Sequence, residues 1–175
     1  MRTTFGTPVV VADSSVLIHL SAIGHLGLLR SLFGLLTVAP AVWREVVAEG
    51  DGRAGAREIE AGLQEGWLEV LQPSQELLLR SLKRQLGDGE AETICLAVEH
   101  RASLVLLDES EARRVAAGFE LQITGIIGIL MRAKLEGRIP LLRPELDRLV
   151  TSGFWIELSL YRRVLALVEE TAQDA

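Results

Sequence analysis

The sequence has a single cysteine and no long apolar run, and these two absences exclude several classes of protein. With Cys95 alone, no disulfide can form within the chain, which favours a reducing compartment. No apolar stretch approaches the ~20 residues that span a bilayer. Residues 1–6 lack the charged and hydrophobic regions of a signal peptide. We therefore expect a cytoplasmic protein with no membrane partner.

Several catalytic signatures are also missing. The three histidines, His19, His25 and His100, have no spacing suited to zinc. The chain contains neither the Gly-x-Ser-x-Gly turn of serine hydrolases nor a phosphate-binding Gly-rich loop, and Gly125–Gly128 resembles only a fragment of a dinucleotide fingerprint. The chemistry must then come from other side chains.

Composition indicates a buried sheet and an uneven distribution of charge. The hydrophobic fraction of 49% and the mean hydropathy of +0.28 are high, as expected when strands are buried on both faces. The net charge is −6, but residues 123–163 hold seven basic and four acidic residues, so that this part carries +3 and the remainder −9. An acid excess suits a chain that binds metal through carboxylates, and an ordinary acidic soluble protein fits it equally well.

The stretch Val9–Leu20 sets the expected architecture. An apolar run over Val9–Ala12 stops at Asp13 and then becomes amphipathic, which is how a buried parallel strand leads into a helix. Short strands alternate with helices from there on. The pattern predicts an α/β fold, a three-layer sandwich with a short parallel central sheet and helices on both faces. We expect one domain over residues 1–175, with a core at about 9–136 that carries an acidic pocket and a C-terminal helical extension over 137–175.

The local patterns predict where these elements begin and end. Pro40 fits the first turn of a helix, and Gly87-Asp88-Gly89 has the composition of a loop. The main expected elements are strands at Leu35–Ala39, Leu104–Leu107 and Leu121–Ile123, and helices at Ser14–Leu20, His25–Phe33, Ala41–Glu49, Glu90–His100, Glu109–Ala117, Gly125–Glu136, Pro144–Val150 and Leu158–Thr171.

Four acidic residues lie at or near the expected carboxyl ends of the strands, where open α/β sheets bind their ligands. Asp13 and Asp108 each end a buried strand, and the carboxyl ends of parallel strands lie at one edge. Glu45 and Glu90 lie on helices that can start from that edge. Four carboxylates in one cleft repel one another unless a cation neutralises them, and oxygen ligands select Mg²⁺ or Mn²⁺. Such ions promote displacement at a phosphodiester.

Each acid also has a structural interpretation. Asp13 and Asp108 are suited to cap the helices that follow them, and Glu45 and Glu90 fit a solvated helix face and a first-turn dipole partner. Glu92 is an alternative to Glu90, but it lies about 200° away around the helix. We prefer Glu90.

The sequence resembles the PIN-domain nucleases, and within them a branch close to the VapC-type toxin ribonucleases. The resemblance rests on five stretches in order, from Val9 to the C-terminal helices. They are VVADSSVLIHL around Asp13, TVAPAVWREVV around Glu45, LGDGEAETICLA around Glu90, LVLLDESEARRVA around Asp108, and ITGIIGILMRAKLEGRIP at 123–140.

The resemblance implies a metal-dependent hydrolysis of RNA that leaves a 5′-phosphate and a 3′-hydroxyl. It assigns Asp13 and Asp108 as direct ligands of Mg²⁺ or Mn²⁺, Glu45 to a water of the ion or a second ion, and Glu90 to the completion of the pocket. Ser14 or Ser15 stands at a small polar position that orients Asp13 or a water. On the substrate side, the candidates are Thr124, Arg132 and Lys134.

By the same resemblance, the expected partners are an RNA substrate, an antitoxin protein and a second copy in a homodimer. The sequence departs from the branch after Asp108, where Glu109-Ser110-Glu111 stands in place of basic residues. This acidic rim motivates an alternative, a PIN-like module that binds nucleic acid or protein with weak catalysis.

Overall fold

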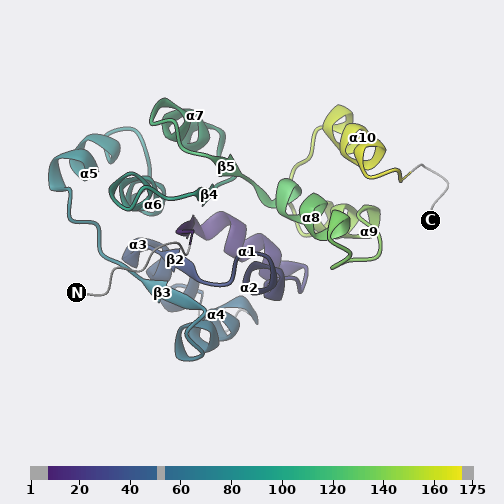
Figure 1. The fold of residues 1–175 in the computed structure, drawn as a ribbon, viewed down its shortest axis with the longest axis horizontal. Helices are drawn as coiled ribbons and strands as arrows, with labels where there is room; N and C mark the ends of the chain where they lie inside the picture. The colour runs from purple at the N-terminus through teal and green to yellow at the C-terminus, as the bar shows by residue number, and fades with distance from the viewer. Residues whose placement is uncertain (1–7, 51–53, 171–175) are drawn as a thin grey trace.

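The structure is a computed structural model that describes residues 8–50 and 54–170. Within these residues, five parallel strands form one sheet in the order β3-β2-β1-β4-β5 (Figure 1). The strands are β1 (Val10–Ala12), β2 (Leu36–Val38), β3 (Leu68–Val70), β4 (Leu104–Leu106) and β5 (Ile123–Thr124). The predicted parallel α/β sandwich is confirmed.

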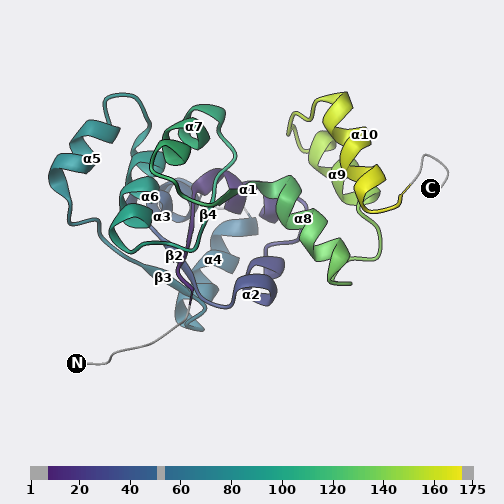
Figure 2. The same cartoon turned by 45° about the horizontal axis from the view of Figure 1, so that its top comes forward.

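Helices cover both faces of the sheet. In the described part of the chain they are α1 (Ser14–Ala22), α2 (Gly27–Phe33), α3 (Pro40–Trp43), the π-helical η1 (Arg44–Ala48), α4 (Ala54–Gln64), α5 (Glu76–Leu82), α6 (Asp88–Glu99), α7 (Ser110–Gly118), α8 (Ile126–Leu135), α9 (Arg143–Thr151) and α10 (Leu158–Leu167). One face carries α1, α2 and α4, and the other carries α6 and α7 (Figures 1 and 2). α6 packs directly on β1 and β4.

The central strands are buried on both sides, which accounts for the high hydropathy of the chain. Every residue of β1 and β2 is buried, and Val11, Leu36 and Val105 are wholly inaccessible to solvent. A strand enclosed by two helical layers has no solvent face, so its sequence does not alternate. No helix among the described residues is long and apolar enough to cross a membrane.

The C-terminal helices lie beside α8, away from the sheet (Figure 2). Glu170 fastens them, because its buried carboxylate accepts hydrogen bonds from the amides of Leu142 (2.6 Å) and Arg143 (2.9 Å) at the start of α9. Lys134 of α8 lies 3.3 Å from the same carboxylate. A carboxylate is favourable at a helix N-terminus, where free amides point outward.

Four predicted helices differ from the observed ones. The stretch expected as a loop, Gly87-Asp88-Gly89, instead opens α6: Gly87 is the N-cap, and its amide donates to Glu90 Oε2 at 3.0 Å. Glu90 is thus the third residue of the helix. The helix expected over 41–49 widens into the π-helix η1 at Arg44. The helix expected from His25 begins at Gly27. The C-terminal helix ends at Leu167, and Thr171 lies outside the described residues.

Glu92 has a structural position in this fold. Its side chain is buried, and its Oε2 accepts a hydrogen bond from the amide of Ala41 in the first turn of α3 at 2.9 Å. Its Oε1 lies 3.3 Å from Lys83 Nζ. Pro40 removes one of the free amides at the start of α3, and Glu92 satisfies the next. Both oxygens of Glu92 are therefore engaged: Oε2 joins α6 to α3, and Oε1 joins it to the end of α5.

Replacing Glu92 by alanine is expected to destabilise the protein. The substitution leaves the buried amide of Ala41 without its acceptor and leaves Lys83 with Asp88 as its remaining acidic partner, and the free energy of unfolding falls by about 2 kcal/mol. Glu90→Ala breaks one exposed contact at a helix start and costs about 0.5–1 kcal/mol. Urea unfolding of the two variants and the native chain measures both values. Equal losses would contradict the structural role of Glu92.

Candidate active site

The carboxyl ends of three adjacent strands are level. The register pairs Ala12 of β1 with Leu106 of β4, and Leu106 with Thr124 of β5. The amide of Asp13 continues this ladder and donates to the carbonyl of Leu106 at 3.0 Å. Asp13 and Asp108 therefore leave neighbouring strands at the same edge of the sheet. In open α/β sheets this edge is where ligands bind.

Asp13 uses its two carboxylate oxygens differently. It is the N-cap of α1, and its Oδ2 accepts from the amide (3.3 Å) and the hydroxyl (3.0 Å) of Ser15. Its Oδ1 is buried and has no hydrogen-bond partner among the described residues. Burial raises the pKa of Asp13 to about 6, and the hydrogen bonds from Ser15 limit that rise.

Asp108 shows the same division. The expected capping of α7 does not occur, since Glu109 is the N-cap there; instead Asp108 Oδ1 accepts from the amide of Ile126 at the start of α8 (3.0 Å). Its Oδ2 is buried, again with no partner in the part of the chain that is described. Burial raises the pKa of Asp108, while the Ile126 amide and the charges of His19 and Arg113 oppose the rise.

Glu90 and Glu45 approach the same edge from α6 and η1. The charge of Glu90 contributes to the raised pKa of Asp13, because the two carboxylates lie close enough to interact electrostatically. Glu45 lies against the start of α6, where a Cβ on Gly89 would stand 2.9 Å from Glu45 Oε1 and 3.0 Å from Oε2. The structure thus brings Glu45 beside the first turn that carries Glu90.

A divalent ion fits the oxygens that these residues leave free. Over residues 8–50 and 54–170, no three His, Cys, Asp or Glu side chains form a group that could hold a metal ion as they stand. The unpartnered Oδ1 of Asp13 and Oδ2 of Asp108 are nonetheless the kind of hard ligand that Mg²⁺ and Mn²⁺ require. Buried carboxylate oxygens without donors are costly, and a cation would relieve that cost.

The other predicted site residues divide into two groups. Ser15 holds Asp13 as described, Ser14 contributes its amide to that carboxylate, and Thr124 lines a groove together with Asp108. The basic residues lie elsewhere. Arg132 bonds to Glu136 (2.7 Å) and the carbonyl of Leu32 (3.3 Å), and stacks on the ring of Phe33, while Lys134 contacts Glu170 and the carbonyl of Pro140.

Sequence reasoning missed two residues that support Asp108. Arg113 donates to the carbonyl of Leu107 at 2.7 Å, beside Asp108. Gly125 lies so close that a Cβ there would be 2.3 Å from Asp108 Oδ1. The Gly125–Gly128 stretch, which looked like part of a dinucleotide fingerprint, instead allows the carboxylate to reach the start of α8. The available signal was a glycine placed directly after the last strand.

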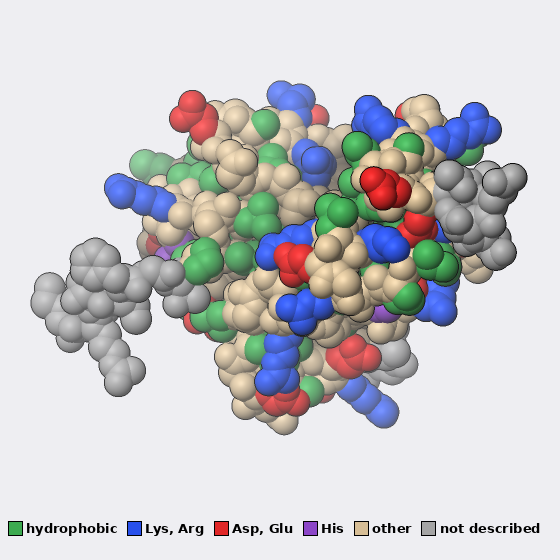
Figure 3. Space-filling view, turned by 45° about the vertical axis from the view of Figure 1, so that its right-hand side comes forward, with side chains coloured by type: hydrophobic (Ala, Val, Ile, Leu, Met, Phe, Trp, Pro, Cys, Tyr) green, Lys and Arg blue, Asp and Glu red, His purple; other side chains and the backbone are tan. Residues whose placement is uncertain are grey.

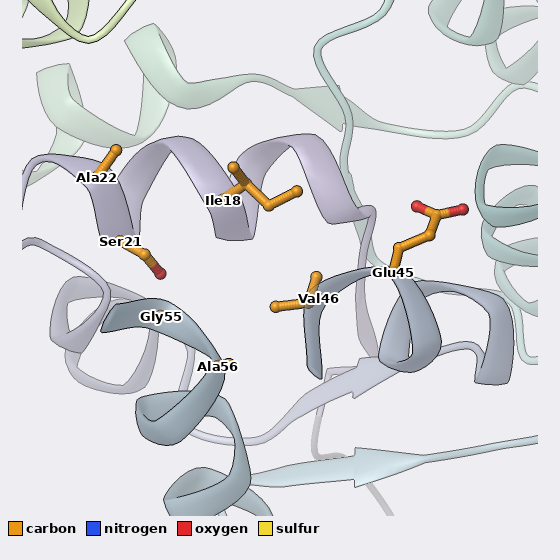
Figure 4. A pocket seen from close by; sticks show the side chains of 7 residues that line it. All are labelled: Ile18, Ser21, Ala22, Glu45, Val46, Gly55 and Ala56. Atoms are coloured by element: carbon orange, nitrogen blue, oxygen red, sulfur yellow. The ribbon is translucent and has the colours of Figure 1, made fainter. Parts of the chain in front are cut away.

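Two cavities border the candidate site. A small one of about 350 Å³ lies between α1, η1 and α4. Figure 4 shows its lining, in which Ile18, Val46 and Ala56 are aliphatic and Glu45 directs its carboxylate away from Ser21 and Gly55. Among the described residues, the lining of this cavity includes no Lys or Arg that could meet a phosphate. The second, of about 660 Å³, runs from Asp108 to the C-terminal helices and is lined by Arg113 among others.

A parallel α/β sandwich with aspartates at the carboxyl ends of neighbouring strands places carboxylates where such folds bind their ligands. The family model DUF3368, described as a PIN domain, matches residues 9–170. The chain belongs to this PIN-domain family, and its fold is of the nuclease type. PIN domains are in general hydrolases that use divalent metals. No protein with curated annotation matches the chain.

The raised pKa of Asp13 predicts how stability depends on pH in the absence of metal. The pKa rises from 3.8 in the unfolded chain to about 6 in the folded one. Between these values the folded state keeps a proton that the unfolded state releases, so the free energy of unfolding falls as the pH rises, by about 3 kcal/mol in all.

Asp13→Asn removes this fall in the free energy of unfolding, because asparagine does not titrate, and its side-chain oxygen still accepts a hydrogen bond at the N-cap. In EDTA, the variant is expected to be more stable than the native chain at pH 7, with the difference disappearing below pH 4. Urea unfolding from pH 4 to pH 7 measures it, with Glu76→Gln, at an exposed site, as the control. An unchanged pH slope in Asp13→Asn would contradict the assignment.

Proposed function

We propose that this protein is a divalent-metal-dependent endoribonuclease, which hydrolyses RNA phosphodiesters at its acidic edge and acts as the toxin of a toxin–antitoxin pair. The observation that carries the proposal is the pair of buried, unpartnered oxygens on Asp13 and Asp108 within the described residues. They project from neighbouring strands whose ends are in register. The membership of the PIN-domain family supports a nuclease.

The four acids have distinct roles in this proposal. Asp13 Oδ1 and Asp108 Oδ2 would hold Mg²⁺ or Mn²⁺, with Glu45 and Glu90 as the further carboxylates of the pocket. When bound, the ion supplies Lewis-acid stabilisation of the phosphodiester and a more acidic water. The protein keeps the two aspartates in place, since Ser15 fixes one and the amide of Ile126 fixes the other. Arg113, next to Asp108, is placed to offset the charge of a phosphate.

Purified protein is expected to cut single-stranded RNA with Mn²⁺ or Mg²⁺, and to lose this activity in EDTA. Asp13→Asn and Asp108→Asn remove a ligand charge at unchanged shape, and each is expected to reduce the rate at least 10²-fold. Gel analysis of an end-labelled RNA measures the cleavage. Glu92→Gln is the matched carboxylate control, because Glu92 joins α3 to α6 and is not one of the proposed metal ligands. This variant is expected to remain active. Activity in EDTA, or full activity of Asp13→Asn, would contradict the proposal.

The position of Gly125 yields an independent test of geometry. Gly125→Ala forces Asp108 off the amide of Ile126, because a Cβ meets Oδ1 at 2.3 Å. A displacement of about 1 Å in a catalytic group is expected to lower the rate about 10²-fold. Gly118→Ala is the control, since a Cβ there meets nothing within 4 Å. Equal rates for the two variants would show that the capped position of Asp108 is not required.

The proposed role as a toxin includes an antitoxin protein and a homodimer as partners. Its support is the resemblance of the five sequence stretches to the VapC-type branch. Co-purification with the product of an adjacent gene, and the mass of the protein in solution, test the two partners. RNA binding without turnover, unaffected by Asp108→Asn, would instead favour the binding module that the exposed acids Glu109 and Glu111 suggest.

A further inference from the structure

A groove of about 660 Å³ connects the candidate active site with the C-terminal helices. Asp108, Arg113 and Thr124 line it from the core, and Trp155 and Arg163 line it from the segment around α10. Its size is that of a pocket for a small ligand or a nucleotide. The groove therefore runs from Asp108, a proposed metal ligand, to the C-terminal helical segment.

Trp155 is the most unusual residue in this lining. Its side chain is 79% exposed, although tryptophan is among the most hydrophobic residues. The adjacent Phe154 is half-buried and meets the ring of His19 edge-on, with ring centroids 4.9 Å apart. Phe154 thus anchors the segment to α1, and the fold does not require an aromatic residue at Trp155.

Arg163 provides the second observation. It is exposed, and no ion pair or hydrogen bond involves it among residues 8–50 and 54–170. In the same part of the chain, Arg148 pairs with Glu145 and Lys134 with Glu170, whereas Arg162, like Arg163, has no ion pair among the described residues but does not line this groove. Lys and Arg side chains surround the C-terminal helices, with acidic side chains between them (Figure 3). An arginine without an acid partner in a groove beside Asp108 is available to a phosphate.

We propose that this groove binds a single-stranded segment of the RNA next to the cleaved bond. Trp155 stacks on one unpaired base, and Arg163 contacts a phosphate of the same segment. Stacking on an exposed aromatic ring together with an arginine is how proteins hold single strands without reading their sequence. A duplex cannot offer a base in this way. The inference rests on the proposed function, since it takes RNA as the substrate at Asp108.

Binding can be measured separately from cleavage, with the full chain in EDTA and a fluorescein-labelled single-stranded RNA of eight nucleotides. Trp155→Ala and Arg163→Ala are each expected to weaken binding about tenfold, and Trp155→Phe is expected to restore most of it. Arg162→Ala is the matched control, because this adjacent exposed arginine lines a separate hollow with Tyr161 and Glu169. A duplex of the same sequence is expected to bind at least tenfold more weakly.

Intrinsic fluorescence provides a readout that a purely structural role would not change. The chain has three tryptophans, and Trp43 and Trp67 are half-buried. Unlabelled RNA is expected to quench the emission of the native chain, and Trp155→Phe is expected to abolish that quenching. In the cleavage assay with Mn²⁺, Trp155→Ala and Arg163→Ala are expected to raise KM and leave kcat within about twofold.

The outcomes separate this inference from the proposed function. Cleavage with an unchanged KM in both variants would overturn the groove and leave the nuclease standing. Quenching and weakened binding without any cleavage would support the groove and overturn the nuclease. If Trp155→Ala instead dissociates a homodimer and leaves RNA binding unchanged, the exposed tryptophan belongs to a protein interface, and the inference is wrong.

Discussion

The geometry of the site depends on the two oxygens of each aspartate having different roles: one is hydrogen-bonded and the other is not. Asp13 gives Oδ2 to Ser15 at the start of α1, and Asp108 gives Oδ1 to the amide of Ile126 at the start of α8. Each contact orients the carboxylate and joins the end of a strand to the beginning of a helix. The second oxygen of each is buried with no partner in the described chain. The interpretations as a helix cap and as a metal ligand are therefore compatible, because they concern different atoms.

The sequence predicted the parts of this arrangement that are local. An apolar run ending in an acid identifies β1 with Asp13 and β4 with Asp108, and the order of strands and helices is sufficient for the parallel sandwich. What could not be predicted depends on contacts distant in sequence. The capping partner of Asp108 lies 18 residues further on, and the buried acceptor for Ala41 is Glu92, 51 residues away. Hydrophobic periodicity carries no information on such pairs, nor on the π-helix that carries Glu45.

The choice between Glu90 and Glu92 illustrates how burial separates two similar residues. They lie on the same turn of α6, yet Glu92 is buried between Ala41 and Lys83, and Glu90 acts on Asp13 through its charge. A buried carboxylate with both oxygens satisfied stabilises the fold. Glu90 caps the start of α6, and its negative charge also contributes to the raised pKa of Asp13, an effect that a bound cation would offset. In our proposal, Glu90 therefore belongs to the metal site and Glu92 to the fold.

The C-terminal helices also contribute to the site in our proposal. The predicted core ends near residue 136, but the groove that begins at Asp108 is closed by Trp155 and Arg163, beyond that boundary. Glu170 and Lys134 fix this wall by joining the segment after α10 to the start of α9 and the end of α8. In our proposal, the acids at the sheet edge perform the chemistry and the C-terminal helices select a single strand. Changes in Trp155 or Arg163 can then weaken the preference for single-stranded over duplex RNA without disturbing the acidic pocket.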